Sequence, residues 1–230
     1  MSTLCVAFDL DDTLYLERDY IRSGFVAVGQ WAAATLEIKH YGEKAWALFE
    51  QGVRGTIFNE ALQSLDRAPE PLLISKMVDI YRNHEPNICL LPDAVECLRS
   101  LRGRTIVGII TDGPLLSQRA KLRTLRLAEY CNLIVCTDRW GKEFYKPHPR
   151  AFEFIQTRAG RGDLAFTYVG DNPAKDFVGP RTLGWDTIRV RRKQGLHFAE
   201  EAAVDASPRV EVADLSRICE ILDLPATSGA

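Results

Sequence analysis

The chain has 230 residues, of which 46% are hydrophobic, which suits one domain or a core domain with a modest insertion. Its formal net charge of -2 gives no electrostatic reason to expect nucleic acid or an acidic membrane as a partner. The six cysteines form no Cys-x-x-Cys pair, so we expect reduced core residues rather than a zinc site. Because no segment is long enough to span a bilayer and no signal peptide precedes the first predicted strand, we expect a cytoplasmic protein.

The chain opens on a short apolar run that ends in two carboxylates. The run at 4–8 predicts a buried strand, and Asp9 and Asp11 follow at its carboxyl end. Two residues apart in an extended chain, they project to the same side. Like charges this close resist joint ionisation, so one carboxylate can stay an anion while the other carries a proton. The pair suits a nucleophile and a general acid, and the simpler alternative is an acidic loop that caps a helix.

A helical block follows the first strand. Apolar side chains recur every three to four residues over 18–40, which predicts one long helix. Further helices are predicted over 43–51, 59–66 and 70–83, with Asn59 as a capping residue. No convincing strand interrupts this block. We therefore predict two domains: a core formed by 1–14 and 89–230, and a helical insertion over 15–88.

Strands and helices then alternate to the end of the chain. Strands are predicted at 105–110, 132–136, 165–169 and 187–190 and from Val210. One helix is predicted through Leu101 with Asp93 as its N-cap, another through about Leu125 with Ser117 as its N-cap, and further helices over 148–159 and 215–222. This alternation predicts an α/β fold: a Rossmann-like parallel sheet with helices on both faces. Ligands of such sheets bind beyond the carboxyl ends of the strands.

Polar residues gather where these predicted strands end. Thr111-Asp112-Gly113 follows the second strand, and Lys146-Pro147 follows the third. The strand at 165–169 runs into Gly170-Asp171-Asn172, with Asp176 five residues after Asp171. Each of these residues alone can be an ordinary turn, surface or capping residue. Their joint occurrence at one edge of one sheet indicates a single site.

The residues at this edge suit phosphoryl transfer, which depends on positioning and on neutralising phosphate oxygens. The hydroxyl of Thr111 and the backbone N–H groups of 111–113 can bind phosphate, and Lys146 brings a positive charge. Asp171 supplies a hard oxygen ligand for magnesium. Asp9 can attack phosphorus in line, as carboxylates do in aspartyl-phosphate enzymes.

The four motifs resemble those of the haloacid dehalogenase-like (HAD) hydrolase superfamily. Phe8-Asp9-Leu10-Asp11-Asp12-Thr13-Leu14 resembles the first motif, Ile110-Thr111-Asp112-Gly113 the second, Lys146-Pro147 the third, and Gly170-Asp171-Asn172-Pro173-Ala174-Lys175-Asp176 the fourth. The resemblance covers roughly 1–14 and 90–224. Nearly all the extra sequence lies between the first two motifs, so the chain is similar to the subgroup with a helical cap after the first motif.

The resemblance implies a role for each motif residue. Asp9 would be the nucleophile, and Asp11 would protonate the leaving oxygen and then activate water. Thr111 would bind the phosphoryl group, and Lys146 would offset the charge of Asp9 and the phosphate. Magnesium is the implied cofactor, with Asp9, the backbone carbonyl of Asp11, Asp171 and Asp176 as its metal site. Asp176 is either a ligand or a residue that orients the ligands, and we favour the second.

Other residues are candidate substrate contacts. Asp112 and Gly113 are expected to bind the phosphoryl group together with Thr111 and Lys146. Polar and aromatic side chains of the helical insertion can reach the substrate, although ordinary surface positions explain them at least as well: Tyr15, Arg18, Tyr20, Arg54 and Asn59. Lys142 and Lys175 compete for the role of the motif lysine, and Lys146 is preferred because it directly precedes Pro147.

These features predict a magnesium-dependent phosphatase that hydrolyses a small-molecule phosphomonoester through an aspartyl phosphate. A haloacid dehalogenase is disfavoured by Asp11, since halide needs no proton. A non-catalytic binding module is disfavoured because Asp9 and Lys146 are both present. A phosphosugar mutase would use the same four motifs and stays an alternative. Sugar phosphates, nucleotides and phosphoglycolate are all open as substrates, and so is the oligomeric state.

Overall fold

The computed structural model describes residues 4–160 and 163–224, and the chain divides into two compact units. The core unit combines Met1–Glu17 with Cys89–Ala230, and the helical unit is Arg18–Ile88. We predicted that the insertion would begin at residue 15. It begins later because the hydroxyl of Tyr15 donates to the carboxylate of Asp11, and the backbone N–H of Glu17 donates to Asp12 Oδ1 over 2.8 Å.

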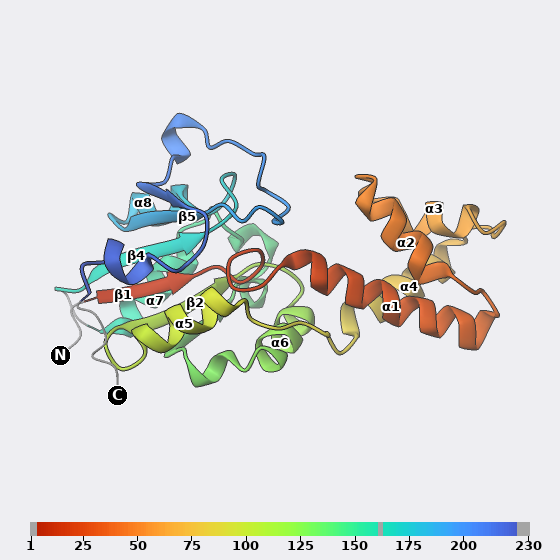
Figure 1. Cartoon of the computed structure of the whole chain (residues 1–230), viewed down its shortest axis with the longest axis horizontal. Helices are drawn as coiled ribbons and strands as arrows, with labels where there is room; N and C mark the ends of the chain where they lie inside the picture. The colour runs from red at the N-terminus through yellow and green to blue at the C-terminus, as the bar shows by residue number, and fades with distance from the viewer. Residues whose placement is uncertain (1–3, 161–162, 225–230) are drawn as a thin grey trace. The chain divides into compact units, whose positions relative to one another are not determined.

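The core unit is built on a six-stranded sheet in the order β3-β2-β1-β4-β5-β6 (Figure 1). The strands are β1 Leu4–Phe8, β2 Ile106–Thr111, β3 Leu133–Cys136, β4 Ala165–Gly170, β5 Asp186–Val190 and β6 Val210–Val212. Every neighbouring pair is parallel. This confirms the predicted Rossmann-like fold.

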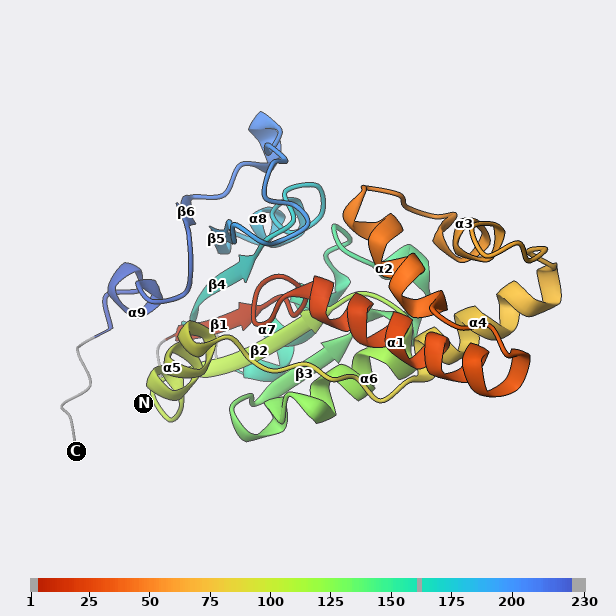
Figure 2. The ribbon, with the colours of Figure 1, turned by 45° about the vertical axis from the view of Figure 1, so that its right-hand side comes forward.

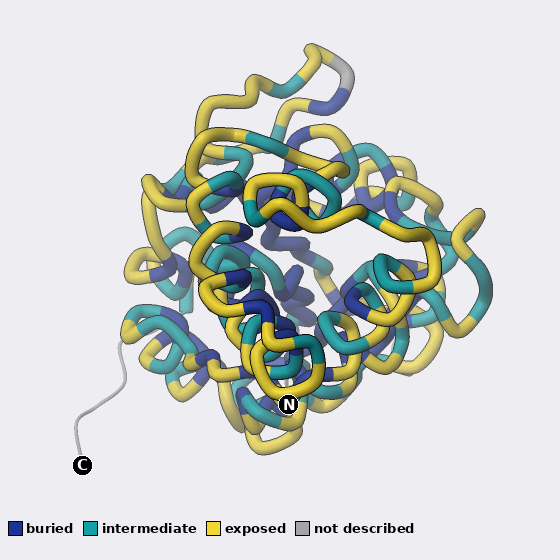
Figure 3. The backbone as a smooth tube through the Cα atoms, turned by 90° about the vertical axis from the view of Figure 1, so that its right-hand side faces the viewer, coloured by how far each residue is buried: buried dark blue, intermediate teal, exposed yellow. Residues whose placement is uncertain are grey.

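Helices cover both faces of this sheet. They are α5 Pro92–Leu101, α6 Leu115–Thr124, α7 Arg150–Ala159, α8 Val178–Thr182 and α9 Ile218–Ile221, with short 3-10 helices at Leu127–Glu129, Thr137–Trp140, Lys142–Phe144 and Val204–Ala206. Ala7 of β1 packs in one cluster with Phe152 and Ile155 of α7. Side chains alternate along a strand, so Val6 and Phe8 project to the opposite face, where they are also fully buried. The buried backbone accordingly runs through the interior, with exposed loops around it (Figure 3).

Three predicted helix caps are wrong. Asp93 is the second residue of α5, behind Pro92, and Ser117 and Asn59 lie inside α6 and α3 (Ile57–Gln63). Proline suits the first position of a helix because its missing N–H would have no helical partner there. The carboxylate of Asp93 instead accepts hydrogen bonds from the Arg192 guanidinium and from a backbone N–H, each over 2.8 Å.

The helical unit contains α1 Glu17–Leu36, α2 Tyr41–Glu50, α3 and α4 Pro71–Asn83 (Figure 2). Its interior is aromatic: Tyr20, Phe25, Phe58 and Tyr81 lie with ring centroids 5.6 to 6.0 Å apart. Tilted and edge-on pairs at these distances stabilise a core beyond the area that they bury. Within 4–160 and 163–224, none of the helices combines the length and apolar character that a bilayer span requires.

A buried arginine fastens the loops at the carboxyl end of the sheet. Arg189 of β5 is fully buried, and its guanidinium donates to the carbonyl oxygens of Asp171, His197 and Glu200 over 3.1, 2.9 and 2.7 Å. It also lies 3.3 Å from a carboxylate oxygen of Glu211. Because a buried cation needs such partners, this residue ties the loop after β4 to the loop after β5.

We expect Arg189→Met to lower the free energy of unfolding by about 3 kcal/mol, since it leaves buried carbonyl oxygens without donors. The neighbouring Arg191 is more exposed, pairs with Glu201 and Glu211 and donates to the Phe198 carbonyl oxygen, so Arg191→Met is the control and should cost much less than Arg189→Met. Urea unfolding of both variants measures the difference. Equal losses would mean that the buried contacts of Arg189 do not stabilise the core.

Candidate active site

The sheet register brings three of the predicted motifs to one edge. Phe8 of β1 pairs with Ile109 of β2 and with Val169 of β4. The residues that follow these strands therefore lie side by side at their carboxyl ends, which includes Asp9 and Asp171. The backbone N–H of Asp9 also donates to the Val169 carbonyl oxygen over 2.8 Å.

Lys146 enters this edge from the loop after β3 and is held by three partners. Its Nζ lies 2.6 Å from Asp9 Oδ1, 2.8 Å from Asp176 Oδ1 and 2.8 Å from the Tyr168 hydroxyl. Burial lowers the pKa of Lys146, but the two carboxylates outweigh it and hold that pKa well above its usual value. An ammonium group has three N–H donors, so all three are engaged. Lys146 is a permanent cation that connects the first and fourth motifs.

Asp9 is held at one oxygen only. Its Oδ2 is buried and has no hydrogen-bond partner among the described residues. Burial raises the pKa of Asp9 to about 6; the Lys146 charge opposes this shift and the Asp176 charge adds to it. A fixed carboxylate with one unengaged oxygen suits attack on phosphorus or coordination of a cation.

The acidic residues of this edge fit a divalent cation. Asp9, Asp171 and Asp176 each offer an oxygen, all within 4.8 Å of one another. No described residue makes a hydrogen bond to the Asp171 carboxylate; burial and the charges of Asp176 and Asp9 hold its pKa well above the usual value. Asp176 uses one oxygen for Lys146 and the other for the N–H of Asn172, 2.8 Å away. This favours Asp9 and Asp171 as the carboxylate ligands and an orienting role for Asp176.

Asp11 has a different set of partners. It accepts hydrogen bonds from the Tyr15 hydroxyl, from Lys121 Nζ over 2.6 Å and from Gln118 Nε2 over 3.0 Å. Gln118 Nε2 also donates to the hydroxyl oxygen of Thr111. Burial raises the pKa of Asp11, but these donors, Lys121 first among them, hold that pKa below its usual value. The Asp11 carboxylate is therefore an anion, and its three hydrogen-bond donors fix its position beside the second motif.

Lys121 and Gln118 belong to none of the sequence motifs and were not predicted, whereas Tyr15 was predicted only as a possible substrate contact. Gln118 and Lys121 lie one helical turn apart on α6, directly after the second motif, and both are buried. Buried polar side chains on one face of a helix that starts at a strand end are a usable signal for a site.

The Asp112 side chain of the second motif forms hydrogen bonds to other parts of the protein. Asp112 Oδ1 accepts hydrogen bonds from the Thr137 hydroxyl over 2.7 Å and from the backbone N–H of Lys146 over 3.3 Å. Its side chain thereby connects the loop of the second motif to the loop that carries Lys146. Gly113 has φ of +124°, a conformation that a residue with a Cβ rarely adopts. Thr111 is fully buried at the end of β2.

Three side chains of the helical unit that were predicted to contact the substrate have partners within that unit. Arg18 pairs with Glu50 over 2.6 Å, and the Arg54 guanidinium lies 3.9 Å from the centroid of the Phe49 ring. Tyr20 is only 5% exposed and packs on Tyr81. Its position in the interior of the unit argues against the predicted contact between Tyr20 and the substrate.

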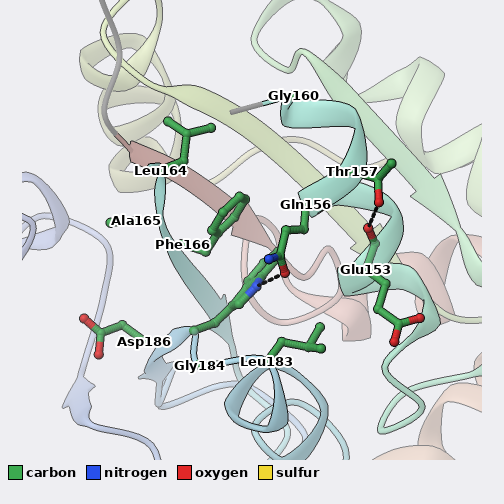
Figure 4. A pocket seen from close by; sticks show the side chains of 11 residues that line it. Glu153, Gln156, Thr157, Gly160, Leu164, Ala165, Phe166, Leu183, Gly184 and Asp186 are labelled. Carbon is green, nitrogen blue, oxygen red and sulfur yellow. Dashed lines mark hydrogen bonds between the residues drawn. The ribbon is translucent and has the colours of Figure 1, made fainter. Parts of the chain in front are cut away.

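A cavity of about 730 Å³ lies at the other edge of the sheet (Figure 4). It is lined by the starts of β4 and β5 and by the second half of α7, including Phe166, Trp185, Asp186 and Gln156. None of the motif residues lines it. Because parallel sheets bind ligands beyond the carboxyl ends of their strands, we place the candidate active site at the motif edge and not in this cavity.

Comparison with known proteins identifies the family. The sequence model of the haloacid dehalogenase-like hydrolases matches residues 3–184, so this chain belongs to that family of hydrolases. The chain is 30% identical to glyceraldehyde 3-phosphate phosphatase from Methanopyrus kandleri over 198 residues, 81% of this chain and 83% of that protein. It is 29% identical to phosphoserine phosphatase from Thermus thermophilus over 195 residues, 84% of this chain and 75% of that protein.

A solved structure shares the fold over nearly all of this chain. A magnesium-bound HAD-hydrolase from Bacillus subtilis superposes with a TM-score of 0.65 at 19% identity, covering 97% of this chain and 100% of that protein.

We expect a strong energetic coupling between Lys121 and Asp11. Their side chains are 5% and 17% exposed, so Lys121→Met leaves a nearly buried carboxylate unpaired and should cost about 3 kcal/mol of unfolding free energy. Combined with Asp11→Asn, it should cost clearly less than the sum of the single losses. Urea unfolding of the three variants measures the coupling.

Arg119→Met, at an exposed position of the same helix, is the control and should cost less than about 0.5 kcal/mol. Additive losses would contradict the coupling.

Proposed function

We propose that this protein is a magnesium-dependent phosphatase that hydrolyses a small phosphorylated metabolite through a phosphoaspartate on Asp9. The observation that carries the proposal is the asymmetry of Asp9. Lys146 binds its Oδ1, while its Oδ2 is buried and has no hydrogen-bond partner in the part of the chain that the structure describes. A second carboxylate, Asp11, follows two residues later. Membership of the hydrolase family and the two phosphatase relatives support the same reaction.

In the first half of the reaction, Asp9 Oδ2 attacks phosphorus and the bond from phosphorus to the leaving oxygen breaks. Asp11 gives a proton to that oxygen. Lys121 favours the anion of Asp11 in the free protein, but the negative phosphate group arrives beside it and favours protonation. The Thr111 hydroxyl and the backbone N–H groups that follow it hold the phosphoryl oxygens, whose charge Lys146 offsets.

In the second half, water attacks phosphorus and Asp11 accepts its proton. The bond between Asp9 and phosphorus breaks, and inorganic phosphate leaves. When bound by Asp9, the backbone carbonyl of Asp11 and Asp171, magnesium would supply positive charge to the phosphoryl oxygens. Asp176, fixed by Lys146 and by the N–H of Asn172, orients this acidic set.

The surroundings of Asp11 support phosphate ester hydrolysis over dehalogenation. An alkoxide leaving group needs a proton, and a halide does not. Three donors fix Asp11 two residues from Asp9, and this supports the proposed acid/base role of Asp11. Both relatives are named for small phosphomonoesters, glyceraldehyde 3-phosphate and phosphoserine. We propose a substrate of this class and, because such metabolites are dissolved in the cytoplasm, that compartment for the enzyme.

Phosphate release from a panel of phosphomonoesters tests the two carboxylates. Asp9→Asn should remove detectable turnover, and Asp11→Asn should lower kcat by about 10²- to 10⁴-fold because leaving-group protonation and water activation both fail. Both variants should stay folded by circular dichroism. Asp186→Asn changes an exposed carboxylate at the far edge of the sheet and should leave the rate unchanged. Wild-type turnover in Asp9→Asn or in Asp11→Asn would refute the role proposed for that carboxylate. Conversion of a phosphosugar to its isomer without phosphate release would identify the protein as a mutase.

Removal of the metal gives an independent test. Chelator should abolish phosphate release, and added Mg²⁺ should restore it. Mg²⁺ should also raise the Tm of the wild-type protein, since a ligand of the folded state stabilises that state. Asp171→Asn should remove most of this Tm shift because it removes one proposed ligand. A Tm shift of wild-type size in Asp171→Asn would exclude that carboxylate as a ligand.

A further inference from the structure

The motif lysine has no free donor to offer a ligand. The side chain of Lys146 is fully buried, and Asp9, Asp176 and Tyr168 accept its three hydrogen bonds. A phosphate group near Asp9 would experience the positive charge of Lys146. It would receive a hydrogen bond from Nζ only if one of the three existing bonds broke.

A second lysine at the same edge of the sheet has side-chain N–H groups that no described residue accepts. Lys175 lies in the loop after β4, directly before Asp176, and its side chain is 30% exposed. Among the described residues, its ammonium group makes one ion-pair contact, at 3.8 Å from Asp112 Oδ2. That distance is too long for a hydrogen bond. The three N–H donors of Lys175 are therefore available to a ligand.

The surroundings of Lys175 place its charge beside the phosphoryl site. Asp112 directly follows Thr111, and its other carboxylate oxygen accepts the backbone N–H of Lys146. The Lys175 ammonium group, 3.8 Å from Asp112 Oδ2, therefore lies beside the second motif.

We propose that Lys175 donates hydrogen bonds to the phosphoryl oxygens of the substrate and of the product phosphate. This inference rests on the proposed phosphatase function and adds a catalytic residue to it. Lys146 then acts through its charge and its hold on Asp9, while Lys175 contacts the group that is transferred. Hydrogen bonds from a cation to phosphate oxygens are strong, and they stabilise the charge that these oxygens carry in the transition state.

The test compares the full-length wild type with Lys175→Gln and Lys175→Arg. Lys175→Gln should weaken the binding of inorganic phosphate, measured by calorimetry with Mg²⁺ present, by about 10- to 100-fold. It should lower kcat/KM for p-nitrophenyl phosphate by a similar factor. Lys175→Arg, which keeps a cation, should recover most of both. Lys142→Gln removes an exposed lysine of the neighbouring loop and should change neither quantity.

A second measurement needs no variant. Lysines of the wild-type protein are acetylated under mild conditions with and without inorganic phosphate, and the labelled positions are identified by mass spectrometry. Phosphate should protect Lys175 and leave Lys142 reactive. Equal labelling of Lys175 in both samples would overturn the proposal even if the variants failed to fold.

Three results distinguish a failure of the proposed Lys175 contact from a failure of the proposed phosphatase function. Wild-type phosphate affinity in Lys175→Gln would overturn the proposed contact. A loss confined to substrates with a second anionic group, with normal turnover of p-nitrophenyl phosphate, would overturn it in favour of a contact elsewhere on the substrate. If the wild type binds phosphate through Lys175 but hydrolyses no ester, the contact stands and the proposed phosphatase function fails.

Discussion

The candidate site depends on one buried ammonium group between two carboxylates. Lys146 Nζ binds Asp9 and Asp176 at 2.6 and 2.8 Å, with the lysine and both acids almost completely buried. A charge buried without a partner is costly, so the lysine and the two acids stabilise one another in this arrangement. Gly170 makes room for it, because a Cβ at that position would lie 2.5 Å from Asp176 Oδ2. The network thus joins the loops after β1, β3 and β4 at one edge of the sheet.

The two carboxylates of the first motif have opposite environments. We predicted from their spacing that one would be an anion and the other would carry a proton. In the free protein, burial raises the pKa of Asp9, whereas Lys121 and two further donors hold that of Asp11 below its usual value. This is the reverse of what nucleophile and acid require. In the reaction that we propose, a divalent cation beside Asp9 and Asp171 would favour the anion of Asp9, and a phosphate dianion would favour protonation of Asp11. The bound reactants would thereby set the protonation states that this reaction needs.

The sheet and the motif residues could be predicted because their signals are local. Each central strand is a short apolar run, and Asp9, Thr111 and Asp171 lie within one residue of a strand end. The helix caps were wrong because capping was inferred from residue type, whereas tertiary partners decide where such a side chain binds: Asp93 reaches Arg192 across 99 positions of sequence. Spacing along a helix also cannot tell whether an aromatic side chain lines a ligand site or packs in the interior.

Helix α6 explains why the partners of Asp11 were missed. Its buried residues are Ser117, Gln118 and Lys121, so its inner face is polar and its hydrophobic pattern is weak. Apolar periodicity identifies a helix that contributes to a core. A helix that buries a lysine and an amide loses the stabilisation that apolar side chains provide when they are buried. Hydrogen bonds to a buried charge that needs donors, such as the Asp11 carboxylate, offset this loss. The polar inner face of α6 is therefore a sign of function, because the same helix would be more stable with an apolar face if it had only to cover the sheet.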